Sequence, residues 1–165
     1  MKKALAPALL LSVAILAPAT AGADEPLLVS EKRMSLETAL RIAQGAIDAC
    51  REKGIQIGVT VVDRAGNPQV MLRDVLATEL TERISRLKAY TAVSFNAATK
   101  ALRDRAASPM VQVEGLVFLT GGLLVQAGGQ TVGAVGVSGA PSGDTDEECA
   151  QAGIDAVTED LEFGG

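Results

Sequence analysis

The stretch TVGAVGVSGAPSGDTDEECAQAG, residues 131–153, predicts a strand, a turn and the beginning of a helix. Glycine recurs at every third position of the strand, at Gly133, Gly136 and Gly139. Glycine inside a strand costs stability, so a close approach of another backbone or of a ligand has to explain it. Because side chains alternate along a strand, Gly136 faces the opposite side from the other two. Helices packing on the sheet are a sufficient explanation, and the floor of a ligand pocket is the alternative.

The turn in this stretch is followed by a segment that predicts the last helix of the chain. The helix begins near Asp144 or Thr145, because each has a glutamate three residues later and so can form a capping box. Upstream, residues 123–129 predict a strand that a Gly-Gly turn joins to the glycine-rich strand. This part of the chain therefore predicts a β-hairpin followed by a helix.

The earlier part of the chain predicts a helix, another hairpin and a long middle helix. Ser35 suits an N-cap, and apolar residues recur at helical spacing until Gly54, which predicts a helix over 35–53. Alternating apolar residues around a turn predict a hairpin over 55–73. An apolar stripe predicts a helix from 79 to about 103; its members are Leu80, Ile84, Leu87, Thr91, Phe95, Ala98 and Leu102. Antiparallel hairpins with helices between and after them indicate an α+β fold of two layers, in which helices pack against an antiparallel β-sheet.

The N-terminus has the pattern of a secretory signal peptide. Two lysines precede an apolar run from Leu9 to Leu16, and small residues follow at 21–23. A membrane anchor is the alternative, but the run is about half of the ~20 apolar residues that a spanning helix needs. We therefore expect a signal peptide over 1–23, a single domain over 24–165 without a membrane span, and a periplasmic or secreted location.

Charge and composition exclude several classes of function. When the two lysines of the leader are removed, 13 of the 15 basic residues remain against 20 acidic ones, a net charge of −7. Such a chain binds nucleic acid poorly, because neutralising phosphates requires a basic surface. The sequence has no histidine, which excludes a Ser-His-Asp triad, a His-ligated zinc and a His-ligated haem. We assign no catalytic residues and no metal site.

Four segments, taken in order, resemble one known family. They are VTVVDRAGNPQVMLRD, KAYTAVSF, VFLTGG and VGAVGVSGAPSGDTDEECAQAG. Over about residues 34–161 the chain resembles the GlcG/HbpS family, whose small proteins have a profilin-like antiparallel sheet, some of them being secreted and some haem-binding. The resemblance implies a homo-oligomer and a porphyrin pocket beside the sheet.

Haem is the cofactor that the resemblance makes possible, although no histidine can serve as its axial ligand. A thioether, a phenol, a hydroxyl or a thiolate would have to take that role. The candidates are Met71, Met110, Tyr90, Thr120, Cys50 and Cys149. For the methionines, filling the core is the alternative role.

An anion site is a second candidate, because basic residues gather on the middle helix and just after it. They are Arg83, Arg86, Lys88, Lys100, Arg103 and Arg105. The alternative is a solvated helix face on which they pair with Glu79, Glu82 and Asp104. Arg73 and Lys88 lie in the segments that resemble the family. The predicted ligand-binding residues are therefore Arg73, Lys88, Tyr90, Thr120, Gly121 and Gly122.

Three classes of function remain. The first is an exported small ligand-binding protein that takes haem or a related tetrapyrrole. The second, implied by the family's association with glycolate metabolism, is a non-catalytic accessory or scaffold protein for periplasmic oxidation of hydroxy acids or alcohols. The third, an enzyme acting on a small acidic substrate, is disfavoured. Turn and capping roles account for Asp63, Asp144 and Asp146, and the chain lacks the Gly-x-Ser-x-Gly pattern of a nucleophile elbow.

The two cysteines, Cys50 and Cys149, predict a disulfide. An even number of cysteines in an oxidising compartment usually pairs. Cys50 lies near the end of the first helix and Cys149 near the start of the last, so they meet if these helices pack antiparallel. Gly153 would let the two helices approach closely. A redox-active or metal-binding thiol pair is the alternative, but the Cys-x-x-Cys spacing is absent.

Overall fold

The computed structural model describes residues 27–163. The predicted signal peptide, 1–23, lies outside the described residues, as do the first residues of the predicted mature domain. Residues 27–30 contain no helix or strand, and from Glu31 onward the described chain forms one compact unit. No helix in the described part of the chain is long and apolar enough to cross a membrane.

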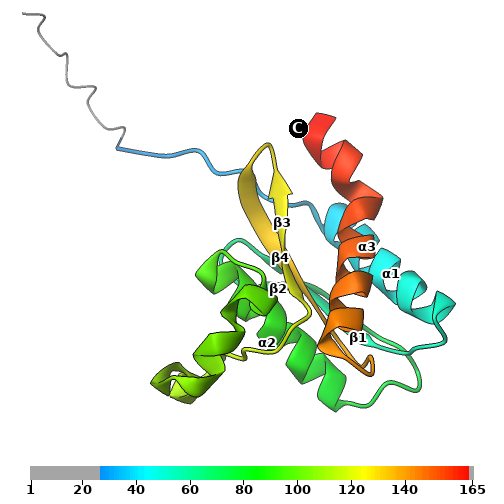
Figure 1. Cartoon of the computed structure of the whole chain (residues 1–165). Helices are drawn as coiled ribbons and strands as arrows, with labels where there is room; N and C mark the ends of the chain where they lie inside the picture. Colours follow the sequence, from blue (N-terminus) through cyan, green and yellow to red (C-terminus); the bar gives the residue numbers. More distant parts are fainter. Residues whose placement is uncertain (1–26, 164–165) are drawn as a thin grey trace, which may run out of the picture. The chain divides into compact units, whose positions relative to one another are not determined.

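Four antiparallel strands form the sheet of this unit (Figure 1). The first predicted hairpin is β1 (Gly58–Asp63) with β2 (Pro68–Arg73), and the second is β3 (Gly122–Ala127) with β4 (Gln130–Ser138). The strand order is β2-β1-β4-β3, so β1 and β4 join the two hairpins at the centre. The predicted α+β fold with an antiparallel sheet is confirmed. Helices cover both faces of the sheet, which adds a layer to the two that were predicted.

One face of the sheet is covered by α1 (Leu36–Glu52) and α3 (Gly143–Phe163), which lie side by side. The larger apolar core lies between them and the sheet; its largest fully buried side chains are Ile42, Ile57, Val59, Val61, Val125, Val135, Val137 and Val157. Burying each of these side chains contributes about 1.5–3 kcal/mol before the loss of conformational entropy. This face therefore holds most of the apolar core.

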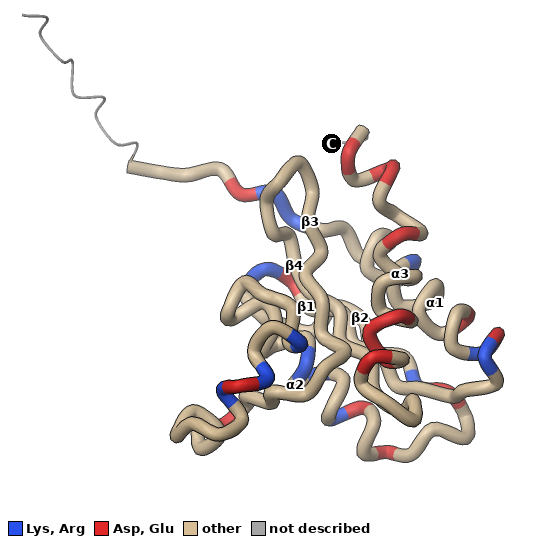
Figure 2. Tube along the Cα trace, viewed as in Figure 1, with Lys and Arg blue, Asp and Glu red and all other residues tan. Residues whose placement is uncertain are grey.

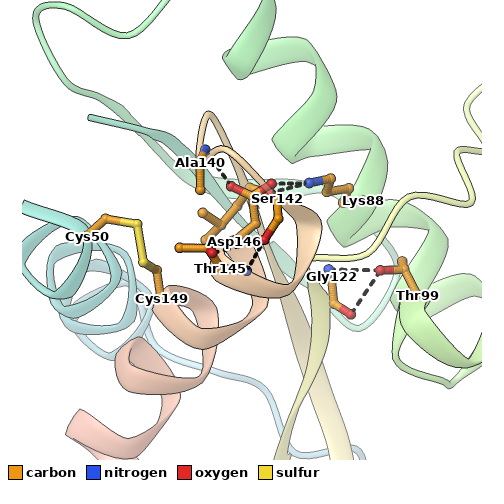
Figure 3. A network of polar contacts seen from close by, with 10 residues as sticks. Cys50, Lys88, Thr99, Gly122, Ala140, Ser142, Thr145, Asp146 and Cys149 are labelled. Carbon is orange, nitrogen blue, oxygen red and sulfur yellow. Dashed lines mark hydrogen bonds and ion pairs between the residues drawn. A yellow bond between two sulfur atoms is a disulfide. The ribbon is translucent and has the colours of Figure 1, made fainter. Parts of the chain in front are cut away.

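The two helices are also joined covalently. Cys50 of α1 and Cys149 of α3 form the predicted disulfide, with their Cα atoms 5.6 Å apart (Figure 3). A Cβ atom at Gly153 would lie 2.4 Å from the carbonyl oxygen of Ile42. The pairing of the cysteines and the close approach at Gly153 are both confirmed.

The start of α3 differs from the prediction. The helix begins at Gly143, and the Oγ atom of Ser142 accepts a hydrogen bond of 3.1 Å from the backbone N–H of Thr145. The predicted starts, Asp144 and Thr145, are one and two residues too late, because the serine before the helix is the residue that caps it. Asp146 is thereby free for a different role.

The other face of the sheet is covered by α2 (Leu80–Phe95). A Cβ atom at Gly136 of β4 would lie 2.1 Å from the carbonyl oxygen of Ser85 and 2.6 Å from the backbone nitrogen of Ala89. On the opposite face, a Cβ at Gly133 would lie 2.3 Å from the carbonyl oxygen of Val62. Close packing therefore explains these strand glycines, and the alternative of a ligand floor is wrong for Gly136.

The middle helix is shorter than predicted and buries a different side. It ends at Phe95, because Asn96 takes a left-handed conformation with φ 48°. Two 3-10 helices follow, η1 (Thr99–Ala107) and η2 (Pro109–Gln112). Leu80 of the predicted apolar stripe is 61% exposed, whereas the buried side consists of Thr81, Ser85, Lys88, Ala89, Thr91, Ala92 and Val93. Only small or hydrogen-bonded side chains fit there, since α2 approaches β4 at a glycine.

Candidate functional site

Two pockets lie beside α2, and the predicted ligand-binding residues divide between them. The Tyr90 pocket, with a volume of about 840 Å³, lies between α2 and residues 111–116, with Met71 of β2 in its wall. The Lys88 pocket, of about 500 Å³, lies between α2, residues 118–120 and the turn from β4 to α3 at 138–143. Lys88 and Thr120 line the second pocket, and Tyr90 lines the first.

The Tyr90 pocket combines charged groups of both signs with apolar walls. Arg83 and Arg86 line it and have no ion-pair partner within residues 27–163. Its apolar wall consists of Met71, Leu87, Val111, Val113 and Leu116. Glu79, Glu82 and Glu114 also line it, and Glu82 is already paired with Arg73. The pocket therefore offers two available guanidinium groups beside an apolar surface.

Tyr90 is held at the edge of this pocket by two glycines. A Cβ atom at Gly66 would lie 2.8 Å from Cδ2 of the ring, and one at Gly115 would lie 3.4 Å from Cε1. Both glycines have a positive φ, of 85° and 90°, which side chains with a Cβ rarely adopt. The ring is packed against these two glycines, and the residue is still 38% exposed and lines the pocket.

Arg73 lines neither pocket. Its Nε atom donates to Glu82 at 2.6 Å, and a terminal nitrogen donates to the carbonyl oxygen of Ala77 at 2.5 Å. These bonds tie the end of β2 to the loop before α2. The structure therefore does not place Arg73 in one site with Lys88, although both lie in segments that resemble the family.

The Lys88 pocket contains a buried ion pair that the sequence did not reveal. Lys88 Nζ donates to Asp146 Oδ2 at 2.6 Å and to the carbonyl oxygen of Val137 at 2.8 Å (Figure 3). Asp146 Oδ1 accepts a hydrogen bond of 2.9 Å from the backbone N–H of Ala140. Both side chains are about 95% buried or more. Burial raises the pKa of the Asp146 carboxyl above its ordinary value, even though Lys88 and the Ala140 amide favour its charged form.

The three residues of the predicted Thr-Gly-Gly segment have different surroundings. Thr120 is 8% exposed and lines the Lys88 pocket, and its hydroxyl, which is not among the fully buried unpaired polar atoms, makes no hydrogen bond to another described residue. A Cβ at Gly121, whose φ is 115°, would lie 2.9 Å from Lys88 Nζ. Gly122 packs under α2, where its N–H donates to Thr99 Oγ1 at 2.9 Å (Figure 3). Thr120 therefore lines the pocket, Gly121 lies beside the ion pair, and Gly122 lies against the backbone of α2.

The six basic residues of the predicted cluster line different pockets or have different partners. Figure 2 shows basic positions on α2 and in the segment after it. Arg83 and Arg86 line the Tyr90 pocket, and Arg103 lines the Lys88 pocket. Lys100 pairs with Asp144 at 2.9 Å, and the guanidinium carbon of Arg105 lies 5.3 Å from the ring centroid of Phe95. Within the described chain none of the six pairs with Glu79, Glu82 or Asp104, so the predicted pairing on a solvated face is wrong.

The surroundings of the candidate axial ligands for haem lower the number of residues that could take this role. Cys50 and Cys149 are joined to each other and offer no thiolate. The sulfur of Met110 accepts a hydrogen bond of 3.5 Å from Arg105. Met71 and Tyr90 share one pocket, and Thr120 lines the other. Among the described residues no three His, Cys, Asp or Glu side chains form a group that could hold a metal ion.

Comparison with known proteins identifies relatives over most of the chain. A family model described as haem degrading protein HbpS-like matches residues 34–155. An uncharacterised 15.0 kDa protein of Citrobacter freundii, from the dhaT-dhaS intergenic region, is 32% identical over 134 residues, which cover 76% of this chain and 93% of the relative.

Solved structures of similar proteins support the same grouping. A double mutant of HbpS from Streptomyces reticuli is 40% identical, with a TM-score of 0.75 and coverage of 86% of this chain and 98% of that one. A PduOC:heme complex is 25% identical, with a TM-score of 0.71 and coverage of 76% and 95%.

Proposed function

The chain belongs to the HbpS-like family, and from that premise we propose that it is an exported protein that binds haem or a related tetrapyrrole in the Tyr90 pocket. The observation that carries this proposal is the composition of the pocket: two arginines without ion-pair partners in the described chain, an apolar wall, and two side chains able to ligate iron. The heme complex of the PduOC relative supports the choice of ligand.

The Tyr90 pocket suits a tetrapyrrole in size and in the presence of two arginines beside an apolar wall. Its volume of about 840 Å³ lies within the range of about 300–1,000 Å³ that is typical of small-molecule sites. Val111 and Val113 are 51% and 52% exposed, so their apolar surfaces are free to contact a flat macrocycle. Arg83 and Arg86 suit the two propionates of haem, because a guanidinium group binds a carboxylate through two parallel hydrogen bonds.

The ligand to the iron would come from Tyr90 or Met71. Both residue types are established axial ligands of haem iron. Tyrosine can serve as the proximal ligand in place of histidine, and methionine binds the iron together with a histidine. Bound haem would supply a redox-active iron to the site. Packing between Gly66 and Gly115 orients the Tyr90 ring, and the apolar wall excludes water from the macrocycle.

Titration with hemin, followed by visible absorption, tests this function. We expect a perturbed Soret band that saturates near one hemin per chain. The Tyr90→Phe variant should change the position of the band, and Arg83→Gln/Arg86→Gln should weaken binding by about tenfold or more. Arg33→Gln/Arg64→Gln removes the same charge away from the pocket and serves as the control. Absence of a perturbed Soret band would contradict the proposal and favour an accessory protein for periplasmic oxidation.

The description of the family also names haem degradation, and the same sample tests it. With ascorbate as electron donor in air, a stable Soret band identifies a binding protein. Decay of the band at a rate that depends on the protein concentration identifies an enzyme.

Export is part of the proposal. The signal-like sequence over 1–23 and the disulfide support it, because structural disulfides persist in oxidising compartments. Mass spectrometry of the protein from the periplasmic fraction or the medium should show a mature N-terminus near Asp24. A full-length chain in the cytosolic fraction alone would contradict export.

Self-association is also part of the proposal. Large apolar side chains on and near α2 are more than half exposed: Val75, Leu76, Leu80 and Leu119. Exposed apolar surface of this kind marks contact sites, and soluble oligomers are mostly symmetric assemblies of identical chains. Light scattering at micromolar concentration should give a multiple of the mature mass, and a clean monomer would contradict the expectation.

A further inference from the structure

We propose that the Lys88 pocket is a second ligand site, separate from the Tyr90 pocket, and that it binds a small monocarboxylate with an apolar body. The site lies on the other side of α2 from the proposed tetrapyrrole site and shares no lining residue with it. The proposal therefore stands whether or not the protein binds hemin.

The charges that line the Lys88 pocket favour a single negative charge. Lys88 and Arg103 contribute two positive charges, and Asp146 is the carboxylate among the described lining residues. One positive charge is therefore left in this pocket, although the whole chain has a net charge of −5. The other acids near the start of α3 are offset, because Lys100 lies 2.9 Å from Asp144 and 3.7 Å from Glu147.

Hydrogen-bond donors in the pocket remain unused by the protein. An ammonium group has three donors, and Lys88 uses two of them on Asp146 and Val137. Thr120 is 8% exposed at the pocket wall, and its hydroxyl, which is not among the fully buried polar atoms, has no hydrogen-bond partner in the described chain. The hydroxyl is therefore available to donate a hydrogen bond to a ligand or to water in the pocket.

The beginning of α3 adds further donors next to Thr120. A Cβ atom at Gly143 would lie 2.8 Å from the Cβ of Thr120, so the first residue of the helix contacts that side chain. The first amides of a helix have no acceptor within the helix and carry partial positive charge. The Thr145 amide is capped by Ser142, whereas the amide of Gly143, which lines the pocket, remains for an anion. An acceptor between Thr120 and Gly143 would thus be bound by several groups.

The remaining wall is apolar. Leu80, Ile84, Phe118 and Leu119 also line the pocket, and Leu80 and Leu119 are 61% and 51% exposed. A ligand with a carboxylate at one end and a short aliphatic or aromatic body at the other fits this division. Inorganic phosphate fits less well, because it carries up to two charges and has no apolar part.

Equilibrium dialysis with radiolabelled benzoate tests the site. We expect saturable binding of one benzoate per chain, competition by butyrate, and at least tenfold weaker competition by butyramide, which has the same shape without the charge. The hemin-saturated protein should bind benzoate with unchanged affinity. Absence of saturable binding, equal competition by butyramide, or loss of benzoate binding on addition of hemin would each overturn the proposal.

Variants assign the binding to this pocket. Thr120→Val should weaken benzoate binding about tenfold, as expected for one hydrogen bond to a charged group, whereas Thr120→Ser retains the hydroxyl and the affinity. Arg103→Gln should also weaken binding, and Arg64→Gln, with the same loss of charge outside the pocket, should not. Wild-type circular dichroism and melting temperature establish that each variant is folded. Unchanged binding by folded Thr120→Val and Arg103→Gln would overturn the assignment.

Discussion

The two faces of the sheet are stabilised in different ways. Under α1 and α3 the contacts are apolar, and the disulfide joins the two helices. Under α2 the protein buries polar groups, among them the hydroxyls of Thr60 and Ser85 at 2.8 Å and the Lys88–Asp146 pair. Buried polar groups stabilise a fold only when each partner is in place. The first face therefore supplies stability, and the second fixes one arrangement of α2 between two pockets.

Removing the disulfide should give the largest loss of stability. The bridge closes a loop with a sequence separation of 99, and the chain-entropy model assigns about 4–5 kcal/mol to a loop of that length. Urea unfolding of Cys50→Ala/Cys149→Ala should show most of this loss, with hemin and benzoate affinities of the folded protein unchanged. A loss below about 1 kcal/mol would remove the distinction between the two faces.

Breaking the buried ion pair should cost nearly as much. Lys88→Met leaves the Asp146 carboxylate buried without its cation, for which a loss of about 3–5 kcal/mol is expected. Lys88→Met/Asp146→Asn should recover at least half of it, because the amide remains an acceptor for the Ala140 N–H.

The matched control is the exposed pair of Arg41 and Asp160 on the other face, 2.7 Å apart compared with 2.6 Å for the buried pair. Arg41→Met should cost about 1 kcal/mol or less, since exposed pairs contribute little. Equal losses for Lys88→Met and Arg41→Met would show that burial of the pair is unimportant.

Adding a methyl group at the tightest glycines should have a smaller effect that differs between the faces. Gly136→Ala and Gly153→Ala each force a helix away from its contact, which typically costs about 1–3 kcal/mol. Gly136→Ala displaces α2 and should weaken both hemin and benzoate binding. Gly153→Ala separates α1 from α3 and should leave both affinities unchanged. The expectation fails if both variants lose affinity equally.

The smallest effect is expected from pH. Because burial raises the pKa of Asp146 in the folded protein, its contribution to the free energy of unfolding is fully present below the unfolded value of 3.8 and decreases as the pH rises through the folded pKa. Asp146→Asn cannot titrate and should remove this part of the pH dependence.

Asp63 should behave in the opposite sense and serves as the control. Burial alone would raise the pKa of Asp63, but hydrogen bonds from Asn67 and Ala65 lower it overall. Its contribution is therefore present above pH 3.8 and is lost as the pH falls through the folded pKa. Thermal unfolding of wild type, Asp146→Asn and Asp63→Asn between pH 3 and 8 distinguishes the two slopes. Parallel pH profiles for the two variants would contradict this assignment.

The fold could be predicted from the sequence because the patterns that indicate its helices and hairpins are local. Period-two alternation, turn residues and helix stops predicted both hairpins and three helices, and the two cysteines predicted how α1 and α3 meet. Which side of α2 is buried could not be predicted from the sequence, because it depends on the strand against which the helix packs. Gly136 selects small residues such as Ser85 and Ala89, so the larger Leu80 faces outward.

The residues of the Lys88 pocket were predicted only in part. Lys88, Thr120 and Gly121 meet because they belong to segments that pack together. The role of Asp146 was not predicted, because an acid near the start of a helix is explained equally well by helix capping. One sequence feature could have indicated that Lys88 is buried. Lys88 follows Thr81 and Ser85 at helical spacing, on the side of the helix that lacks large residues.

The position of the disulfide also determines when the fold can be completed. Cys50 belongs to the first described helix and Cys149 to the last, so the bridge can form only after almost the whole chain has been synthesised. Until then α1 has no partner helix, and Cys50 carries a free thiol. A chain that ends before Cys149 keeps that thiol permanently and is open to mixed disulfides with other proteins. The bridge therefore distinguishes chains that contain both cysteines from truncated ones.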